Sequence, residues 1–138
     1  MQHKTCLHSL NHSVFDLNYH IVLVVKYRRP IINYEIACSL NKIFDDLLKK
    51  WGCCLSEFGH EADHCHLLVK SHPTLNLSSL ITNLKSVSAR HIRAGFKTHV
   101  DRHFWKPYFW SRGYAVISAG GVSLNVIRQY ILSQGQSG

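Results

Sequence analysis

The stretch CCLSEFGHEADHCHLLVK, residues 53–70, contains two short apolar segments on either side of a polar turn. Residues 53–59 and 64–70 each have the length and composition of a β-strand, and His60 to Asp63 form the polar connection. Two strands joined by so short a turn pair antiparallel. The sequence therefore predicts a β-hairpin in the middle of the chain.

Helical patterns lie on both sides of this hairpin. Before it, apolar residues recur at spacings of three and four over residues 34–51, and Gly52 is placed to end that helix. After it, residues 77–95 predict a second helix whose buried stripe runs from Leu77 to Ile92. Both helices have one apolar face, so we expect them to cover a sheet.

Two more strands and a last helix complete the pattern. Residues 14–27 are rich in β-branched and aromatic residues and predict a long strand, which Pro30 prevents from continuing. Residues 108–118 predict another strand with Gly113 as a candidate bulge, and residues 122–134 predict a helix capped by Ser123 or Gly121. The order β-α-β-β-α-β is that of the split βαβ, or ferredoxin-like (RRM-like), α+β fold, with two helices on one face of an antiparallel sheet. The last helix is added to that pattern.

The composition is that of a globular protein with a polyanionic partner. The chain has 138 residues, and we expect one domain over residues 1–138. Sixteen Lys and Arg against eight Asp and Glu leave a net charge of +8. Such an excess favours nucleic acid as the partner, although many basic proteins are merely soluble.

The sequence does not indicate a membrane protein or a disulfide-rich protein. The longest apolar run, Ile21 to Val25, is far shorter than the roughly 20 residues of a membrane span, and Met1 to His12 lacks the apolar core of a signal peptide. We therefore expect a cytoplasmic protein without membrane association. The five cysteines include no CxxC pair, so we expect reduced thiols and no zinc finger.

The sharpest local feature is His64-Cys65-His66 in the second hairpin strand. Side chains alternate along a strand, so His64 and His66 point to the same face, about 7 Å apart, and Cys65 points to the other. Two imidazoles on one face can bind one metal ion. A pair of exposed histidines in a His-rich protein would give the same pattern.

The last helix offers candidate partners for such a metal. Tyr130 and Gln134 are four residues apart and share a helix face. The tyrosine oxygen can act as a nucleophile on a phosphate, and the amide oxygen of Gln134 can bind the metal. The alternative is that Tyr130 is an ordinary core aromatic, because it lies between Val126 and Ile127 in helical projection.

A basic segment supplies candidate DNA contacts. Residues 85–112 contain seven Lys and Arg and a single acidic residue, Asp101, and aromatic residues are interleaved with the later cations. Cations bind phosphates and aromatic rings stack on unpaired bases. The alternative is a solvated helix face with core aromatics. The DNA-binding candidates are Lys85, Arg90, Arg93, Lys97 and Arg112.

Together, these motifs closely resemble the HUH single-tyrosine transposases of the insertion-sequence 200/605 type. The matching segments follow that family's order and cover nearly the whole chain. They are Tyr19-His20-Ile21-Val22, Lys26-Tyr27-Arg28-Arg29-Pro30, Asp63-His64-Cys65-His66-Leu67-Leu68, Leu84-Lys85 with Ser88-Ala89-Arg90, Phe109-Trp110-Ser111 with Gly113-Tyr114, and residues 127–134, IRQYILSQ. Cys65 departs mildly from the family, which usually has a larger aliphatic residue between the histidines.

This resemblance implies a ferredoxin-like homodimer in which His64, His66 and Gln134 bind Mg²⁺ or Mn²⁺. It implies that Tyr130 attacks a DNA phosphate, leaving a 5′-phosphotyrosine and a free 3′-OH, on single-stranded transposon ends marked by hairpins. Gly120 and Gly121 precede the tyrosine helix and form a plausible hinge. The helix can then dock on its own subunit or, in trans, on the partner's histidines.

Two other functions fit part of these observations. A non-catalytic module that binds single-stranded nucleic acid would use the same fold and the same basic segment. A metal-dependent hydrolase that uses water would leave Tyr130 without a role. Mg²⁺ prefers all-oxygen ligands, whereas two imidazoles and an amide suit Mn²⁺ better, so we expect tighter binding of Mn²⁺.

Overall fold

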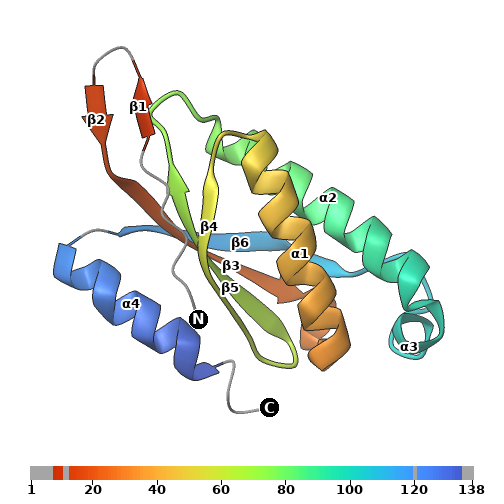
Figure 1. Cartoon of the computed structure of the whole chain (residues 1–138). Coiled ribbons are helices and arrows are strands. Elements are labelled where there is room, and N and C mark those ends of the chain that lie inside the picture. The colour runs from red at the N-terminus through yellow and green to blue at the C-terminus, as the bar shows by residue number, and fades with distance from the viewer. Residues whose placement is uncertain (1–7, 11–12, 120, 135–138) are drawn as a thin grey trace.

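A computed structural model describes residues 8–10, 13–119 and 121–134 of the chain. These residues form the expected α+β fold, with four strands in one antiparallel sheet and a small separate hairpin (Figure 1). The elements are β1 (His8–Leu10), β2 (Ser13–Phe15), β3 (Leu17–Val25), the 3-10 turn η1 (Lys26–Arg28), α1 (Tyr34–Lys50), β4 (Cys54–His60), β5 (His64–Ser71), α2 (Leu77–Gly95), α3 (Lys97–Asp101), β6 (Trp110–Ala119) and α4 (Gly121–Gln134).

The order of the strands in the sheet is β4-β5-β3-β6, and each pair of neighbours is antiparallel. The hairpin of β4 and β5 was predicted, and the β-α-β-β-α-β order of β3, α1, β4, β5, α2 and β6 confirms the split βαβ pattern. Helices α1 and α2 lie side by side on one face of the sheet, and α4 lies on the opposite face (Figure 1).

The main core lies between the sheet and the helices α1 and α2. Alternation along the strands sends Leu23 and Leu67 into it, where they meet Phe44 of α1 and Leu84 of α2, all fully buried. Cys65 joins them with no exposed surface, as its place between two outward histidines predicted. The opposite face of β3 and β5 carries the histidines together with apolar side chains such as the fully buried Leu68, and α4 covers it.

The ends of α1 follow from local sequence. The side chain of Asn33 accepts a hydrogen bond from the backbone N–H of Ile36 at 2.9 Å and caps the first turn. At the other end Gly52 takes φ +72°, and the N–H groups of Gly52 and Cys53 donate to the carbonyls of Lys49 and Leu48. This is a Schellman ending, which favours glycine at that position, so the predicted stop at Gly52 is confirmed.

The long strand predicted over residues 14–27 is divided. It breaks at Asp16, whose carboxylate accepts a hydrogen bond from Asn18 and pairs with Lys70, so β2 pairs with β1 in a separate hairpin. It also ends at Val25 instead of continuing to Tyr27, because η1 has positive φ at Tyr27. Helix α3 was not predicted, since five residues are too few to show a helical period.

Gly113 lies in an irregular part of the ladder, as expected. Leu23 pairs with Tyr114 and Val25 pairs with Trp110, so residues 111–113 of β6 face the single residue Val24.

Free thiols are found at Cys38, Cys53 and Cys65. Cys54 is disulfide-bonded, which corrects the expectation of reduced cysteines throughout, because the lack of a CxxC pair in the sequence does not exclude a disulfide. Among the described residues, no helix is both long and apolar enough to cross a bilayer.

Candidate active site

Two histidines on β5 form the centre of the candidate site. His64 and His66 lie on the sheet face that α4 covers, with ring centroids 5.0 Å apart and ring planes at 77°. Their cross-strand partners on β3 are Val24 and Val22, so the central strand of the sheet fixes their backbone. The strand alternation expected for the two histidines is therefore present.

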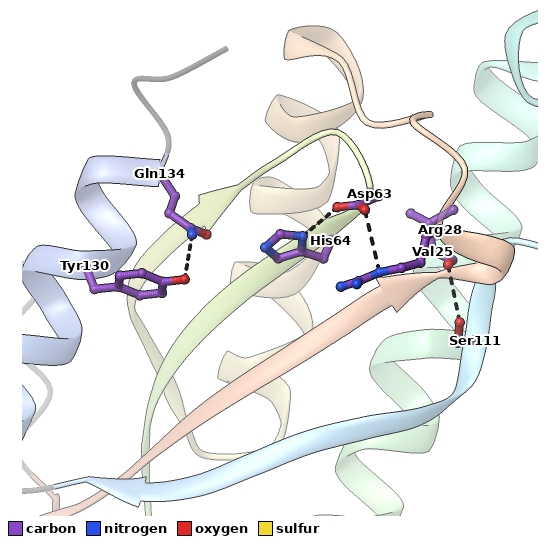
Figure 2. A network of polar contacts seen from close by, with 7 residues as sticks. All are labelled: Val25, Arg28, Asp63, His64, Ser111, Tyr130 and Gln134. Atoms are coloured by element: carbon purple, nitrogen blue, oxygen red, sulfur yellow. Dashed lines mark hydrogen bonds and ion pairs between the residues drawn. The ribbon is translucent and has the colours of Figure 1, made fainter.

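Asp63 orients the first histidine. Its carboxylate lies 2.7 Å from Nδ1 of His64, and a carboxylate accepts, so Nδ1 of His64 carries the proton. The lone pair of His64 is then on its other ring nitrogen, which points toward Tyr130 and Gln134 (Figure 2). A carboxylate behind a histidine in this way is the usual support of a metal-binding imidazole.

His20 of β3 orients the second histidine. Its Nε2 lies 2.9 Å from Nδ1 of His66, and the two rings are stacked with centroids 5.1 Å apart. Nε2 of His66 is buried and has no hydrogen-bond partner in the part of the chain that the structure describes. Burial, with the neighbouring imidazoles of His20 and His64, lowers the pKa of His66 to about 4, against a smaller opposing effect of Gln134. His66 is therefore neutral at neutral pH, the form in which imidazole binds metals.

Helix α4 brings Tyr130 to these histidines. The Tyr130 ring contacts the His66 ring edge to face, with centroids 5.3 Å apart. Its hydroxyl oxygen accepts a hydrogen bond from Nε2 of Gln134 at 2.7 Å, and half of the side chain is exposed. The reading of Tyr130 as a core aromatic is thus wrong: Ile131, the next residue, is the one that is fully buried.

A glycine on β4 determines how closely α4 approaches. Gly59 is the cross-strand partner of His66, and a Cβ at Gly59 would collide with the carbonyl oxygen of Ile131 and lie 2.7 Å from its Cγ2. One turn away, Nε of Arg128 lies 3.5 Å from Oε1 of Glu57, whose side chain is almost completely buried. The absent side chain and the ion pair fix the helix so that Tyr130 faces His66.

The donor set fits a divalent cation. Within the described ranges no three His, Cys, Asp or Glu side chains cluster as metal ligands, and the Gln134 amide oxygen is the candidate for a third protein ligand. Figure 2 shows that oxygen on the side of His64, while the amide nitrogen faces Tyr130. The buried Nε2 of His66 without a partner and the carboxylate behind His64 are both features of a metal site.

Only one of the two glycines of the predicted hinge lies among the described residues. Gly120 lies outside the described residues, and Gly121 is the first residue of α4. In the chain as described, Tyr130 contacts His66 of the same chain, which is the cis arrangement.

The predicted DNA-binding residues divide between two shallow grooves. Arg90, Arg93 and Lys97 line a groove of about 560 Å³ together with Trp105 and Lys106. Lys97 is paired there with Asp101 at 2.6 Å, and Arg93 donates to the carbonyl of Pro107. Three of the five candidates are therefore brought together beside exposed Trp105.

The other two candidates lie in an adjoining groove of about 400 Å³, which shares Arg93 and Pro107 with the first. The Lys85 ammonium donates to the carbonyls of Ser111 at 2.5 Å and Arg112 at 2.9 Å, and burial lowers the pKa of Lys85. Lys85 thus joins α2 to β6, whereas the Arg112 side chain is exposed.

The interleaved aromatics also divide. Phe109 and Trp110 belong to the core, and the Trp110 indole donates to the buried Ser88 hydroxyl at 2.9 Å. Trp105 is 81% exposed, so of the three it alone is available for stacking.

Comparison with known proteins identifies the family. A family model described as "Transposase IS200 like" matches residues 13–134. The chain belongs to this family. Its members are transposases, enzymes that bind, cut and join DNA, so the site on β5 and α4 lies in a transposase fold.

The relatives extend over most of the chain. The ISDra2 transposase TnpA of Deinococcus radiodurans is 27% identical over 121 residues, 88% of this chain and 86% of the relative. The transposase for insertion sequence element IS200 of Salmonella typhimurium is 30% identical over 126 residues, 91% of this chain and 82% of the relative.

Two solved structures are similar. A crystal structure of a Deinococcus radiodurans R1 protein assigned as a transposase superposes with a TM-score of 0.74, 28% identity and coverage of 92% of this chain and 97% of that one. A REP-associated tyrosine transposase bound to a REP hairpin shares the fold alone, with a TM-score of 0.54, 9% identity and coverage of 83% and 62%.

Several residues of this transposase site escaped the sequence analysis. His20 lies on a strand far from the HCH motif in sequence, whereas Glu57 and Gly59 belong to the other strand of the same hairpin, and all three are placed beside the motif or α4 by the register of the sheet. The sequence feature that could have pointed to His20 is its position as a histidine in another predicted strand. A single sequence does not show which residue of β3 faces His66, so that signal could not be used.

Proposed function

We propose that this transposase cleaves and rejoins single-stranded transposon ends through a 5′-phosphotyrosine on Tyr130, with His64, His66 and Gln134 holding Mg²⁺ or Mn²⁺. The observation that carries the proposal is the half-exposed Tyr130 hydroxyl, bonded to Gln134 and beside a histidine whose Nε2 is buried without a partner. When bound, the metal would offset phosphate charge and orient the leaving oxygen.

The chain's own groups account for the covalent step. The Tyr130 oxygen accepts a hydrogen bond from Gln134, so its own hydroxyl proton points to another acceptor. Because half of Tyr130 is exposed, a solvent water can be that acceptor. Attack on phosphorus forms the bond from the Tyr130 oxygen and breaks the bond to the 3′ oxygen of the preceding nucleotide. The phenolic proton goes to solvent and the 3′ oxygen takes one up. The link keeps the phosphoester, so a 3′-OH can reverse the step and join strands.

The proposed substrate is single-stranded DNA with a hairpin. The proposal is supported by two adjoining grooves lined by Arg90, Arg93 and Arg112, whose cations suit the phosphates of a polyanion. It is also supported by exposed Trp105, on which an unpaired base can stack. A protein of the same fold has been solved with a DNA hairpin. The proposal assigns the chain to the cytoplasm, where such DNA is found.

The proposal includes a homodimer. Strand β6 pairs only with β3 in the described part of the chain, so the outer edge of its ten residues has no strand beside it there. Tyr114 and Ile117 on β6 are exposed, at 46% and 58%. A long exposed edge with apolar side chains favours pairing with a second chain.

The covalent adduct tests the proposal. A labelled single-stranded end with its hairpin should give a protein–DNA band on a denaturing gel, and Tyr130→Phe should abolish it while hairpin binding stays intact. The same sequence as a perfect duplex should give little adduct. Hairpin binding without any adduct would favour the non-catalytic module, and cleavage by Tyr130→Phe at the wild-type rate would favour a hydrolase that uses water.

A further inference from the structure

The turn after β3 has an unusual backbone. Tyr27 and Arg28 have φ of 57° and 52°, and they are the only non-glycine residues with positive φ among those described. This left-handed region is unfavourable for any residue with a Cβ, and two such residues in succession are rarer still. Strained backbone of this kind clusters at functional sites such as active sites and ligand-binding sites.

Core packing does not account for the strain. No residue of η1 is buried, and the Tyr27 side chain is 62% exposed. A glycine would form the same turn more easily. What the turn gains by having tyrosine is an aromatic ring held out from the surface.

Cations and a second ring surround Tyr27. The Tyr108 ring meets it edge on, with centroids 6.1 Å apart. Lys26 Nζ lies 5.5 Å from the Tyr27 centroid and 4.7 Å from that of Tyr108, and the Arg29 guanidinium carbon lies 6.0 Å from Tyr27. An exposed ring among cations is the composition of sites that stack unpaired bases and hold their phosphates.

The turn is joined to the histidine site. The N–H of Val25 donates to the carbonyl of Asp63 at 2.8 Å. Arg28 Nε lies 3.6 Å from Oδ2 of Asp63, whose other oxygen binds His64 (Figure 2). On its other side, Lys26 and Tyr108 line the groove that contains Arg112. The turn that carries Tyr27 therefore contacts this groove on one side and Asp63 on the other.

We propose that Tyr27 is a stacking platform for an unpaired base of the single-stranded DNA next to the scissile phosphate, with Lys26 and Arg29 on the adjacent phosphates. The inference rests on the proposed function, because it needs a single strand at His64. It adds a binding site that the HCH motif and Tyr130 do not include.

The test uses Tyr130→Phe, which binds without cleaving, and a short single-stranded oligonucleotide from the mapped cleavage site. 2-Aminopurine replaces one base at a time, and stacking on a ring quenches its fluorescence. One position should be quenched on binding. Adding Tyr27→Ala should remove that quench and weaken binding by about ten-fold or more. Tyr27→Phe should keep both.

Two further variants separate stacking from folding. Tyr27→Gly should lose the quench while the melting temperature stays equal or rises, because glycine relieves the positive φ. Tyr34→Ala, at an exposed tyrosine of α1 outside the cluster, should bind and quench normally. Normal quench in Tyr27→Ala, or equal loss in Tyr34→Ala, would overturn the inference and leave the function standing if the wild type still forms the adduct. A missing wild-type adduct would overturn the function instead.

Discussion

At the scale of single residues, each imidazole of the site has a partner behind it. Asp63 accepts from His64, and His20 is bonded to His66, so each ring has a supporting partner at Nδ1 and its other nitrogen is left for a ligand. Such supporting groups commonly change metal affinity by about 10- to 100-fold. Asp63 and His20 are therefore expected to contribute to metal affinity alongside the HCH motif.

Removal of the metal should stop cleavage. EDTA should abolish adduct formation, Mn²⁺ should restore it, and His64→Ala should give an inactive protein that Mn²⁺ rescues poorly, because it has lost one of the three proposed protein ligands. Adduct yield on a denaturing gel measures this. Full activity in EDTA would contradict the metal assignment of His64, His66 and Gln134.

Loss of His20 should weaken metal binding, although His20 is not itself a proposed metal ligand. His20→Ala should reduce Mn²⁺ affinity by about 10-fold or more, and His20→Gln should retain more of it, because an amide oxygen can still accept from Nδ1 of His66. Titration of free Mn²⁺ by electron paramagnetic resonance measures this independently of cleavage. Unchanged affinity in a folded His20→Ala protein would show that His20 only fills space.

At the scale of elements, α4 reaches the histidines because Gly59 has no side chain. Gly59→Ala should displace α4 and lower the rate of adduct formation, since the new Cβ collides with the carbonyl of Ile131. Overpacking of this kind costs about 1–3 kcal/mol. Hydrogen exchange should become faster in residues 125–134 and stay unchanged in α1.

Gly95→Ala is the matched control for Gly59→Ala. A Cβ at Gly95 meets nothing within 4 Å, so this change should leave both the adduct rate and exchange in α4 as in the wild type. If Gly59→Ala behaves like Gly95→Ala, the close approach of α4 to β4 is not what positions Tyr130.

The sequence predicts well those elements that are long, clearly periodic and bounded by recognisable end signals. Helices α1, α2 and α4 were found within one residue at each end, since apolar spacing and the glycines around them mark their limits. The break at Asp16 and the early end of β3 at Val25 were missed, because they depend on tertiary contacts and on positive φ at Tyr27. Spacing also does not show that the ammonium of Lys85, a predicted DNA contact, donates to backbone carbonyls of β6.

At the scale of the whole molecule, the contacts that dock α4 do not depend on which chain supplies the helix. Gly59 and Glu57 would receive Ile131 and Arg128 of a partner in the same way as their own. An exchanged helix of this kind in a two-fold dimer gives two composite sites. The cis arrangement described for one chain is thus compatible with a trans arrangement in the proposed dimer.

Mixed dimers distinguish the two arrangements. Inactive His64→Ala and inactive Tyr130→Phe are combined and allowed to exchange subunits, with mixed dimers verified by differing tags. In trans, one site of each mixed dimer has both His64 and Tyr130, so cleavage should return. In cis, every site lacks one of them, and verified mixed dimers without cleavage would exclude the trans arrangement for this step.

The central claim, that Tyr130 becomes linked to the 5′ phosphate of the cut strand, is tested most directly by the polarity of the adduct. A single-stranded end is labelled at its 5′ terminus in one reaction and at its 3′ terminus in another, and the products are separated on a denaturing gel. The 3′ label should stay with the protein, on a peptide that mass spectrometry identifies by Tyr130, and the 5′ label should leave on a fragment ending in 3′-OH. Retention of the 5′ label, or linkage to any residue other than Tyr130, would contradict the account.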